Sequence, residues 1–242
     1  MDGFDGLFGE DYLWFWLPLL TDERSDAEAD LAWRLLRLEP GMEVLDLACG
    51  HGRLANRLAQ RGARVTGLDR SALFLEKARA DAAALGVDVE YVEGDMREIP
   101  WRGRFDAALN WFTAFGYHPD EELRGILRGV REALRPGGRF ALETISYTAL
   151  AARFQPAGVT ERDGDFLLEV RRLEPARGGA RTEFIAIRGG VARRYDVFIR
   201  MPTFTELRDW MLGAGFTSVE ALGQDGEPLT REHFRMVALA TA

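Results

Sequence analysis

The segment LDLACGHGRLA, residues 45–55, places the single cysteine of the chain, Cys49, two residues from a histidine, His51. A thiol and an imidazole form a catalytic pair only when the base lies at hydrogen-bonding distance and the pKa of the thiol is lowered. This tight loop is better suited to holding a ligand through its backbone than to presenting a catalytic thiol and imidazole. The other two histidines, His118 and His233, lie in separate segments. We therefore interpret Cys49 and His51 as lining residues and predict no metal site.

Two glycines of the same loop, Gly50 and Gly52, allow unusual backbone angles and a close approach of a ligand to the backbone. The loop lies between a predicted strand and a predicted helix, where backbone N–H groups at the helix start can bind a ligand. Asp46 precedes the loop, and Asp69 and Asp95 end the next two predicted strands. In open α/β sheets these positions meet at one edge, where ligands bind.

The three carboxylates decide between two ligands. The glycines, followed by Ala55 and Asp69, also satisfy the dinucleotide fingerprint, so an NAD-dependent oxidoreductase is an alternative. Asp46, however, is a poor neighbour for a pyrophosphate and an acceptable one for a cation. A site with three carboxylates suits a ligand that carries a sulfonium, an ammonium and a ribose, which is S-adenosylmethionine.

Two periodicities alternate along the chain and indicate the elements that position these residues. Apolar runs predict strands over 43–48, 63–69, 88–95, 104–112 and 139–144, and helical patterns predict helices over 25–41, 52–62, 71–86 and 119–138. Ser25 with Glu28 is a candidate capping box, Ser71 a candidate N-cap, and Pro119 suits a first helical position. The alternation predicts a doubly wound, mostly parallel α/β sheet.

After Thr144 the rhythm changes to extended segments over 165–173, 181–188 and 191–200, separated by Gly- and Pro-bearing turns. These segments predict an antiparallel β meander. A helix over 203–216 and strands over 217–222 and 234–240 return the chain to the parallel layer. We expect an N-terminal aromatic lid segment and helix (1–40), an α/β domain (41–144 plus 204–242) and an inserted substrate cover (145–203).

Composition limits the possible functions. The chain has 242 residues, 47% of them hydrophobic, and a net charge of -8, which argues against a nonspecific grip on nucleic acid. The acidic start lacks the basic region of a secretory signal, and the apolar run of residues 12–20 is too short to cross a bilayer. One cysteine cannot form an internal disulfide. We expect a cytoplasmic protein without a membrane partner, either a monomer or a homodimer.

Five segments together resemble the class I S-adenosylmethionine-dependent methyltransferases. They are VLDLACGHGRLA, VTGLDRS, VEGDMREIP, FDAALNWFTAFGYH and LRPGGRFALET, in that order. The loop matches the family pattern D-x-[GA]-x-G-x-G through Asp46, Ala48, Gly50 and Gly52, with alanine where glycine is commoner. The segments GDMR and FTAFGYH and the β-rich insertion are similar to a bacterial subgroup that includes small-molecule and sugar-amine N-methyltransferases.

The resemblance implies a Rossmann-like sheet of seven strands with an antiparallel hairpin at one edge. It implies that the loop holds the methionine part of the cofactor, Asp69 with Arg70 beside it the ribose hydroxyls, and Asp95 with Met96 the adenine. Asn110 and Trp111 would lie near the transferred methyl. Tyr12 is a candidate lid residue over the cofactor.

Three further residues are candidates for the chemistry of the acceptor: His118, Tyr117 and Glu143. His118 could be a general base or only a helix cap, Tyr117 could place an aromatic face beside a cation, and Glu143 ends a strand at the same edge. We expect in-line methyl transfer from S-adenosylmethionine to a small-molecule nucleophile, nitrogen rather than oxygen, leaving S-adenosylhomocysteine. A non-catalytic protein that binds the same cofactor is a further alternative.

Overall fold

The computed structural model describes residues 6–242, so residues 1–5 of the expected N-terminal segment lie outside the described residues. Seven strands form one sheet in the order β10-β11-β5-β4-β1-β2-β3. All neighbours are parallel except β11, which runs antiparallel to both β5 and β10. The strands are β1 (Glu43–Leu47), β2 (Arg64–Asp69), β3 (Val89–Glu93), β4 (Phe105–Asn110), β5 (Leu134–Ile145), β10 (Ser218–Gly223) and β11 (Arg235–Thr241). The predicted parallel sheet with an antiparallel edge is confirmed.

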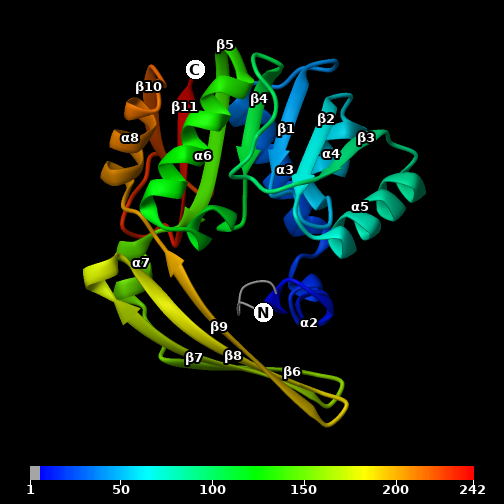
Figure 1. Cartoon of the computed structure of the whole chain (residues 1–242), viewed down its shortest axis with the longest axis vertical. Helices are drawn as coiled ribbons and strands as arrows, with labels where there is room; N and C mark the ends of the chain where they lie inside the picture. The colour runs from blue at the N-terminus through cyan, green and yellow to red at the C-terminus, as the bar shows by residue number, and fades with distance from the viewer. Residues whose placement is uncertain (1–5) are drawn as a thin grey trace.

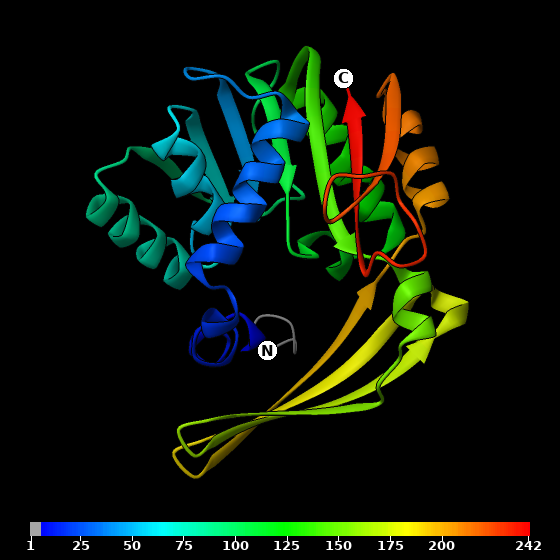
Figure 2. The ribbon, with the colours of Figure 1, turned by 180° about the vertical axis from the view of Figure 1, so that it is seen from behind.

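Helices cover both faces of this sheet, as Figures 1 and 2 show from opposite sides. One apolar core packs α6 (Asp120–Ala133) and α8 (Phe204–Gly213) against the sheet. A second core, on the other face, packs α3 (Asp22–Leu36), α4 (Arg53–Gln60) and α5 (Ala72–Leu85). The sheet is therefore doubly wound, and its parallel strands are buried on both sides, which explains their continuous apolar runs.

The helix starts test the capping predictions. Ser71 caps α5 as predicted, by accepting a hydrogen bond from the backbone N–H of Phe74 at 3.3 Å. The prediction for Ser25 is wrong, because α3 begins earlier with Thr21 as N-cap and Ser25 is buried inside the helix. Pro119 is itself the N-cap of α6 rather than its first residue. Both errors lie within one helical turn, where local sequence signals overlap.

Between β5 and α8 the chain forms a second, antiparallel sheet of four strands in the order β6-β7-β8-β9. The strands are β6 (Ala157–Arg162), β7 (Asp165–Glu174), β8 (Gly179–Arg188) and β9 (Val191–Arg200). The predicted meander is confirmed. The prediction did not include β6, nor the short helix α7 (Tyr147–Ala152) that precedes β6. β6 is an edge strand that exposes alternate residues, so its sequence carries little apolar signal.

The N-terminal aromatic segment forms α2 (Glu10–Phe15) and a 3-10 turn, η1 (Leu17–Leu19). Leu7 and Phe15 belong to a third apolar cluster, which they share with the inner face of the second sheet. Asp11 ties α2 to the same sheet, because its carboxylate accepts hydrogen bonds from Arg188 at 2.8 Å and from Tyr195 at 2.8 Å. In Figures 1 and 2, α2 lies between the main sheet and the second sheet. No helix within residues 6–242 is long and apolar enough to cross a membrane.

Candidate active site

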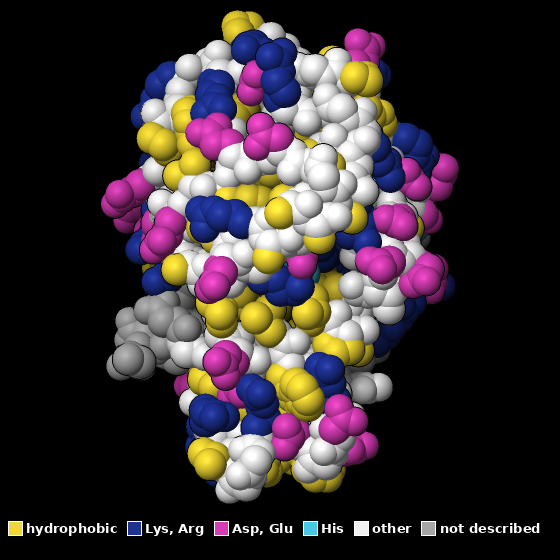
Figure 3. Space-filling view, turned by 90° about the vertical axis from the view of Figure 1, so that its right-hand side faces the viewer, with side chains coloured by type: hydrophobic (Ala, Val, Ile, Leu, Met, Phe, Trp, Pro, Cys, Tyr) yellow, Lys and Arg dark blue, Asp and Glu magenta, His cyan; other side chains and the backbone are white. Residues whose placement is uncertain are grey.

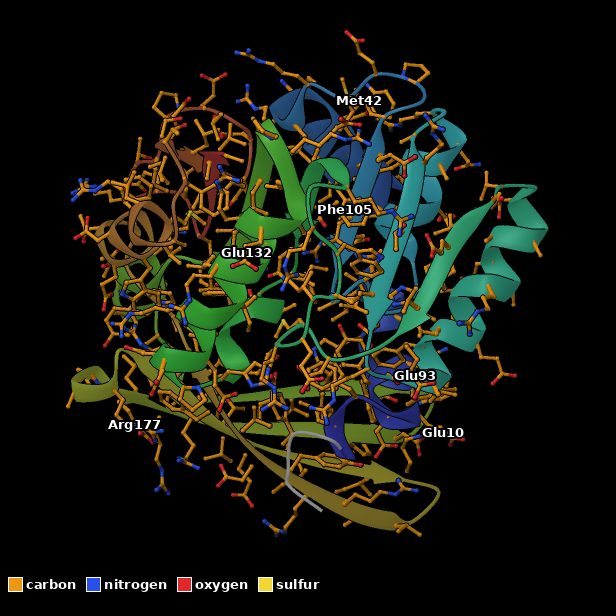
Figure 4. The ribbon with its side chains drawn as sticks, turned by 45° about the horizontal axis from the view of Figure 1, so that its top comes forward. Glu10, Met42, Glu93, Phe105, Glu132 and Arg177 are labelled. Carbon is orange, nitrogen blue, oxygen red and sulfur yellow. The ribbon has the colours of Figure 1, made fainter. Side chains whose placement is uncertain are left out.

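A cavity of about 750 Å³ lies between the carboxyl ends of β1 to β4, the helix α2 and the inner face of the second sheet. Figure 4 shows the geometry: Glu93, which ends β3, and Glu10 of α2 lie on the side of the second sheet, whereas Met42, which precedes β1, lies at the opposite edge. The size is that of a small-molecule site, which spans about 300–1,000 Å³. The cavity is therefore at the edge of the sheet that the sequence predicts.

The loop after β1 has three residues with left-handed backbone angles, Ala48 (φ 56), Gly50 (φ 57) and Gly52 (φ 76). The backbone N–H of Gly50 donates to the Asp69 carboxylate at 2.8 Å, which fixes the loop to the end of β2. Gly52 does not line the cavity. A Cβ on Gly52 would lie 2.1 Å from the Tyr91 hydroxyl oxygen, so this glycine serves helix packing.

Asp46 and Asp69 line the cavity together with residues of the loop after β1. Asp46 is 3% exposed, and burial raises its pKa to about 7; the Arg53 guanidinium opposes this shift and Asp69 adds to it. Burial also raises the pKa of Asp69, against the N–H groups of Ser71 and Gly50 that favour its ionised form. Two partly desolvated carboxylates in one cavity attract a cationic ligand, because it restores their ionised state.

Asp95, Met96 and Arg70 also line the cavity, beyond Asp69. Both carboxylate oxygens of Asp95 accept hydrogen bonds from Arg97, and this contact lowers the pKa of Asp95 to about 2. Asp95 is thus an anion at neutral pH, and Arg97 fixes the position of its carboxylate. Met96 is buried beside it.

Of the two residues expected at the end of β4, only Trp111 lines the cavity. Asn110 is 0% exposed, and its side-chain N–H group donates to the Leu47 carbonyl at 2.9 Å. The Asn110 side chain thus bridges two neighbouring strands through its N–H group, and its place beside the cofactor stays a prediction. β1 supplies a partner for this N–H group, whereas the Asn110 Oδ1 is buried with no hydrogen-bond partner in the described residues.

Glu143 does not line the cavity and does not fit the predicted role in the chemistry. Its buried carboxylate forms an ion pair with Arg235, through Nε and, at 2.7 Å, through Nη2. It also accepts a hydrogen bond from the backbone N–H of Phe112 at 2.7 Å. Phe112 and Thr113 are consecutive non-glycine residues with φ 62. Glu143 is therefore a positioning residue that holds a strained turn at the cavity wall.

Tyr12, Tyr117 and His118 all line the cavity. Burial raises the pKa of Tyr12 to about 12 and also raises the pKa of Tyr117, so both hydroxyls are protonated near neutral pH. Burial lowers the pKa of His118, with a further contribution from Arg97. His118 Nδ1 lies 3.4 Å from Glu122. A neutral imidazole has one N–H donor and one basic lone pair, so His118 has the chemistry to accept a proton.

The sequence did not single out Arg53, the first residue of α4, although it follows the glycine loop directly. Its side chain is 9% exposed and pairs with Glu28, and its Nη1 is buried with no hydrogen-bond partner in the described part of the chain. Three guanidinium carbons lie over the ring of Phe112, those of Arg24 at 5.0 Å, Arg53 at 5.5 Å and Arg235 at 5.0 Å. Glu28 and Glu143 pair with these three arginines, so this corner keeps a net positive charge, which suits a carboxylate.

Cys49 and His51 line the loop side of the cavity. Burial raises the pKa of the Cys49 thiol, and burial lowers the pKa of His51 to about 4. Both groups are thus neutral near pH 7, and a neutral buried thiol is a poor nucleophile. Residues 6–242 contain no group of three or more potential metal ligands.

The chain is similar to known methyltransferases. Residues 44–138 match the family model of a methyltransferase domain. The cypemycin N-terminal methyltransferase of a Streptomyces species is 32% identical over 213 residues, 82% of this chain and 82% of that protein. A ubiquinone biosynthesis O-methyltransferase of Pseudomonas aeruginosa is 30% identical over 200 residues, 81% of this chain and 73% of that protein.

Two solved structures have the same fold. An S-adenosylmethionine-dependent methyltransferase from Clostridium acetobutylicum has a TM-score of 0.77 at 17% identity, with 95% of both chains covered. The CcbJ methyltransferase from Streptomyces caelestis has a TM-score of 0.74 at 24% identity, with 90% of this chain and 89% of that chain covered. The chain belongs to the class I S-adenosylmethionine-dependent methyltransferases. Family membership favours methyl transfer over the hydride transfer of the NAD-dependent alternative.

The residues present fit S-adenosylmethionine. Its amino acid part carries an ammonium and a carboxylate, and the cavity offers Asp46 for the first and the unpartnered Arg53 Nη1 for the second. Its ribose carries two hydroxyls, and the Asp69 carboxylate lies at the end of β2 where such groups bind. The donor and acceptor chemistry of the walls thus matches each polar part of the cofactor.

Proposed function

We propose that this methyltransferase acts in the cytoplasm on a nitrogen nucleophile of a small molecule. One observation carries the proposal: a single cavity joins the acidic strand ends to the inner face of the second sheet. The cofactor belongs at the strand ends, which leaves the space under residues 145–203 for the acceptor. In this proposal residues 41–144 and 204–242 form the cofactor domain, and residues 1–40 supply a lid segment, whose described part includes α2, and the helix α3.

For the cofactor we propose that Gly50, Ala48 and Asp46 surround the methionine part and that Asp69, with Arg70, holds the ribose. Asp95 and Met96 border the adenine. We add Arg53 for the carboxylate, since its Nη1 is buried without a partner in the described residues. Gly52 and Asn110 support this site from behind, through packing and through the Leu47 carbonyl.

When bound, the cofactor supplies a methyl group that its sulfonium already makes electrophilic. The residues of this chain have to align the nucleophile and exclude water, and such positioning contributes at most about 7–11 kcal/mol of the barrier. Tyr12 on α2 and Phe184 on β8 belong to the walls that exclude water. We propose that His118 accepts a proton from an acceptor that arrives as an ammonium, because its lowered pKa keeps it neutral near pH 7.

Nitrogen is favoured over oxygen on two grounds. The relative that is 32% identical is named as an N-terminal methyltransferase. Methylation of an amine produces a cation, and Trp111 and Tyr117 offer aromatic faces in the cavity. The Pseudomonas relative is named as an O-methyltransferase, so an oxygen acceptor is the outcome that an assay has to distinguish.

Two measurements test this proposal. Isothermal titration should show binding of S-adenosylhomocysteine by the parent protein and at least tenfold weaker binding by Asp69→Ala. Transfer of labelled methyl groups from S-adenosylmethionine into a metabolite extract should then give a product labelled at nitrogen. The proposal is wrong if the parent does not bind millimolar S-adenosylhomocysteine, or if Asp69→Ala binds it as well as the parent. A product labelled only at oxygen would refute the assignment to nitrogen, and a protein that binds the cofactor but labels nothing would be the non-catalytic alternative.

A further inference from the structure

The part of the cavity under the second sheet is predominantly apolar. Its walls come from the end of α7, the start of β11 and the inner faces of β8 and β9. They include Leu150, Phe154, Phe184, Ile199, Met201 and Phe234. Figure 3 shows hydrophobic side chains gathered at the waist between the α/β body and the second sheet, with basic and acidic side chains around them. An acceptor that fills this space must bury an apolar body.

Five polar side chains lie on the walls that the second sheet and its entry segment contribute: Glu169, Arg171, Thr182, Arg153 and Gln155. Glu169 and Arg171 are alternate residues of β7 and form an ion pair along its inner face. Thr182 lies opposite Arg171 in the register of β8. The group therefore offers a carboxylate acceptor, guanidinium donors and a hydroxyl within one small area.

A glycine makes room for this ion pair. Gly158 of β6 lies opposite Glu169, and a Cβ at Gly158 would lie 3.0 Å from the Arg171 guanidinium and 3.1 Å from a Glu169 carboxylate oxygen. A side chain at position 158 would require the ends of these two side chains to shift by a few tenths of an ångström. The side chains of Arg171 and Glu169 are 25% and 19% exposed, so the pair is sheltered yet still reaches the cavity.

The chemistry of these groups selects the acceptor. Glu169 is the only carboxylate on the wall that the second sheet contributes, and Arg171 already neutralises it. A free amino sugar, with hydroxyls around its ring, would find few partners on the apolar walls and would lose hydration without compensation. A paired acid and base instead matches a group with a donor and an acceptor side by side, which is an amide.

We propose that the acceptor is an apolar amine of the peptide type, with its amine at the cofactor and an amide at the Glu169–Arg171 pair. This assignment rests on the proposed function and names the substrate class of the same site. The amide N–H donates to Glu169 and its carbonyl accepts from Arg171. The apolar body lies between them, against Phe154, Phe184 and Phe234.

Calorimetry on the complex with S-adenosylhomocysteine tests the proposal with three probes: leucyl-phenylalaninamide, phenethylamine and glucosamine. We expect the dipeptide amide to bind most tightly, phenethylamine more weakly, and glucosamine at least tenfold more weakly than the dipeptide amide. Arg171→Ala should weaken binding of the dipeptide amide about tenfold. It should leave the affinity for phenethylamine unchanged, because phenethylamine lacks an amide. The matched control is Arg172→Ala, because Arg172 is the next residue of β7 and is exposed on the strand's other side.

The outcomes are distinguishable. Unchanged binding of S-adenosylhomocysteine shows that each variant is folded. The peptide-type assignment would be overturned if glucosamine bound as tightly as the dipeptide amide or more tightly. It would also be overturned if Arg171→Ala and Arg172→Ala lost the same affinity for the dipeptide amide. Either result would leave the assignment of the cofactor site intact. Failure of the parent to bind S-adenosylhomocysteine, seen before any amine is added, would refute the proposed function and this assignment together.

Discussion

The ion pair between Glu143 and Arg235 predicts a large and specific loss of stability in Glu143→Gln. The glutamine keeps the size of the side chain and an oxygen that can accept from the Phe112 N–H. It removes the charge opposite Arg235. The Glu143 side chain is 3% exposed and the Arg235 side chain 16% exposed, so the guanidinium would remain in a poorly solvated place without its anion.

The expected magnitude follows from this burial. Removing one partner of a buried ion pair costs about 3–5 kcal/mol, because the other charge is left uncompensated. For a chain of this length each 1 kcal/mol lowers the melting temperature by about 2–4 °C. The melting temperature of Glu143→Gln should therefore fall by about 6–20 °C. Binding of S-adenosylhomocysteine should weaken as well, since the turn at Phe112 and Thr113 forms part of the cavity wall.

Urea and thermal denaturation measure this loss, with the double variant Glu143→Gln/Arg235→Met as the control. The double variant removes both charges and should recover most of the stability, because no buried charge is then unpaired. A loss below about 1 kcal/mol in Glu143→Gln would refute the reasoning. So would a double variant that is less stable than the single one.

Three further predictions concern the end of β1 and the loop that follows it. Ala48→Gly should stabilise the protein by about 1 kcal/mol in urea denaturation, because glycine adopts the left-handed backbone conformation of this position without the strain that alanine has there. A variant less stable than the parent would show that Ala48 is not strained. Gly52→Ala should cost more stability than Gly50→Ala in the same assay, since only the first meets Tyr91, and equal costs would count against that contact. Asp46 has a folded pKa of about 7, above its unfolded value, so the apoprotein should lose stability as pH rises from about 4 to 7. Affinity for S-adenosylhomocysteine should rise over pH 6–8 in titration calorimetry. Asp46→Asn should weaken both dependences, and the remainder belongs to Asp69, whose pKa burial also raises; dependences that stay unchanged would show that Asp46 is not the group that titrates.

Much of the site follows from local sequence. A short apolar strand followed by Gly50 predicts a loop at a strand end, and parallel strands bring Asp46 and Asp69 to the same edge. The structure places both carboxylates in the cavity. The cap of α5 at Ser71 is equally local, because the hydroxyl bonds the backbone three residues on.

Other roles depend on contacts that no spacing reveals. Glu143 ends a strand at the right edge, yet Arg235, 92 positions away, takes its carboxylate out of the cavity. Gly52 matches a ligand-binding pattern, yet Tyr91 of β3 is the reason that a side chain is excluded there. Arg53 has no signal in the sequence beyond its place after the loop, and Asn110 turns to a neighbouring strand rather than to the cavity.

The sequence by itself determined the fold class, the glycine loop and most of the succession of strands and helices along the chain, because periodicity and glycine spacing are properties of near neighbours along the chain. The tertiary structure alone decided which carboxylates face the cavity, which are neutralised by distant arginines, and what lies under the second sheet. The physical reason is burial. A side chain's charge, its pKa and its access to a ligand are fixed by what packs around it, and for Asp46, Glu143 and Arg171 those neighbours come from several elements of the chain.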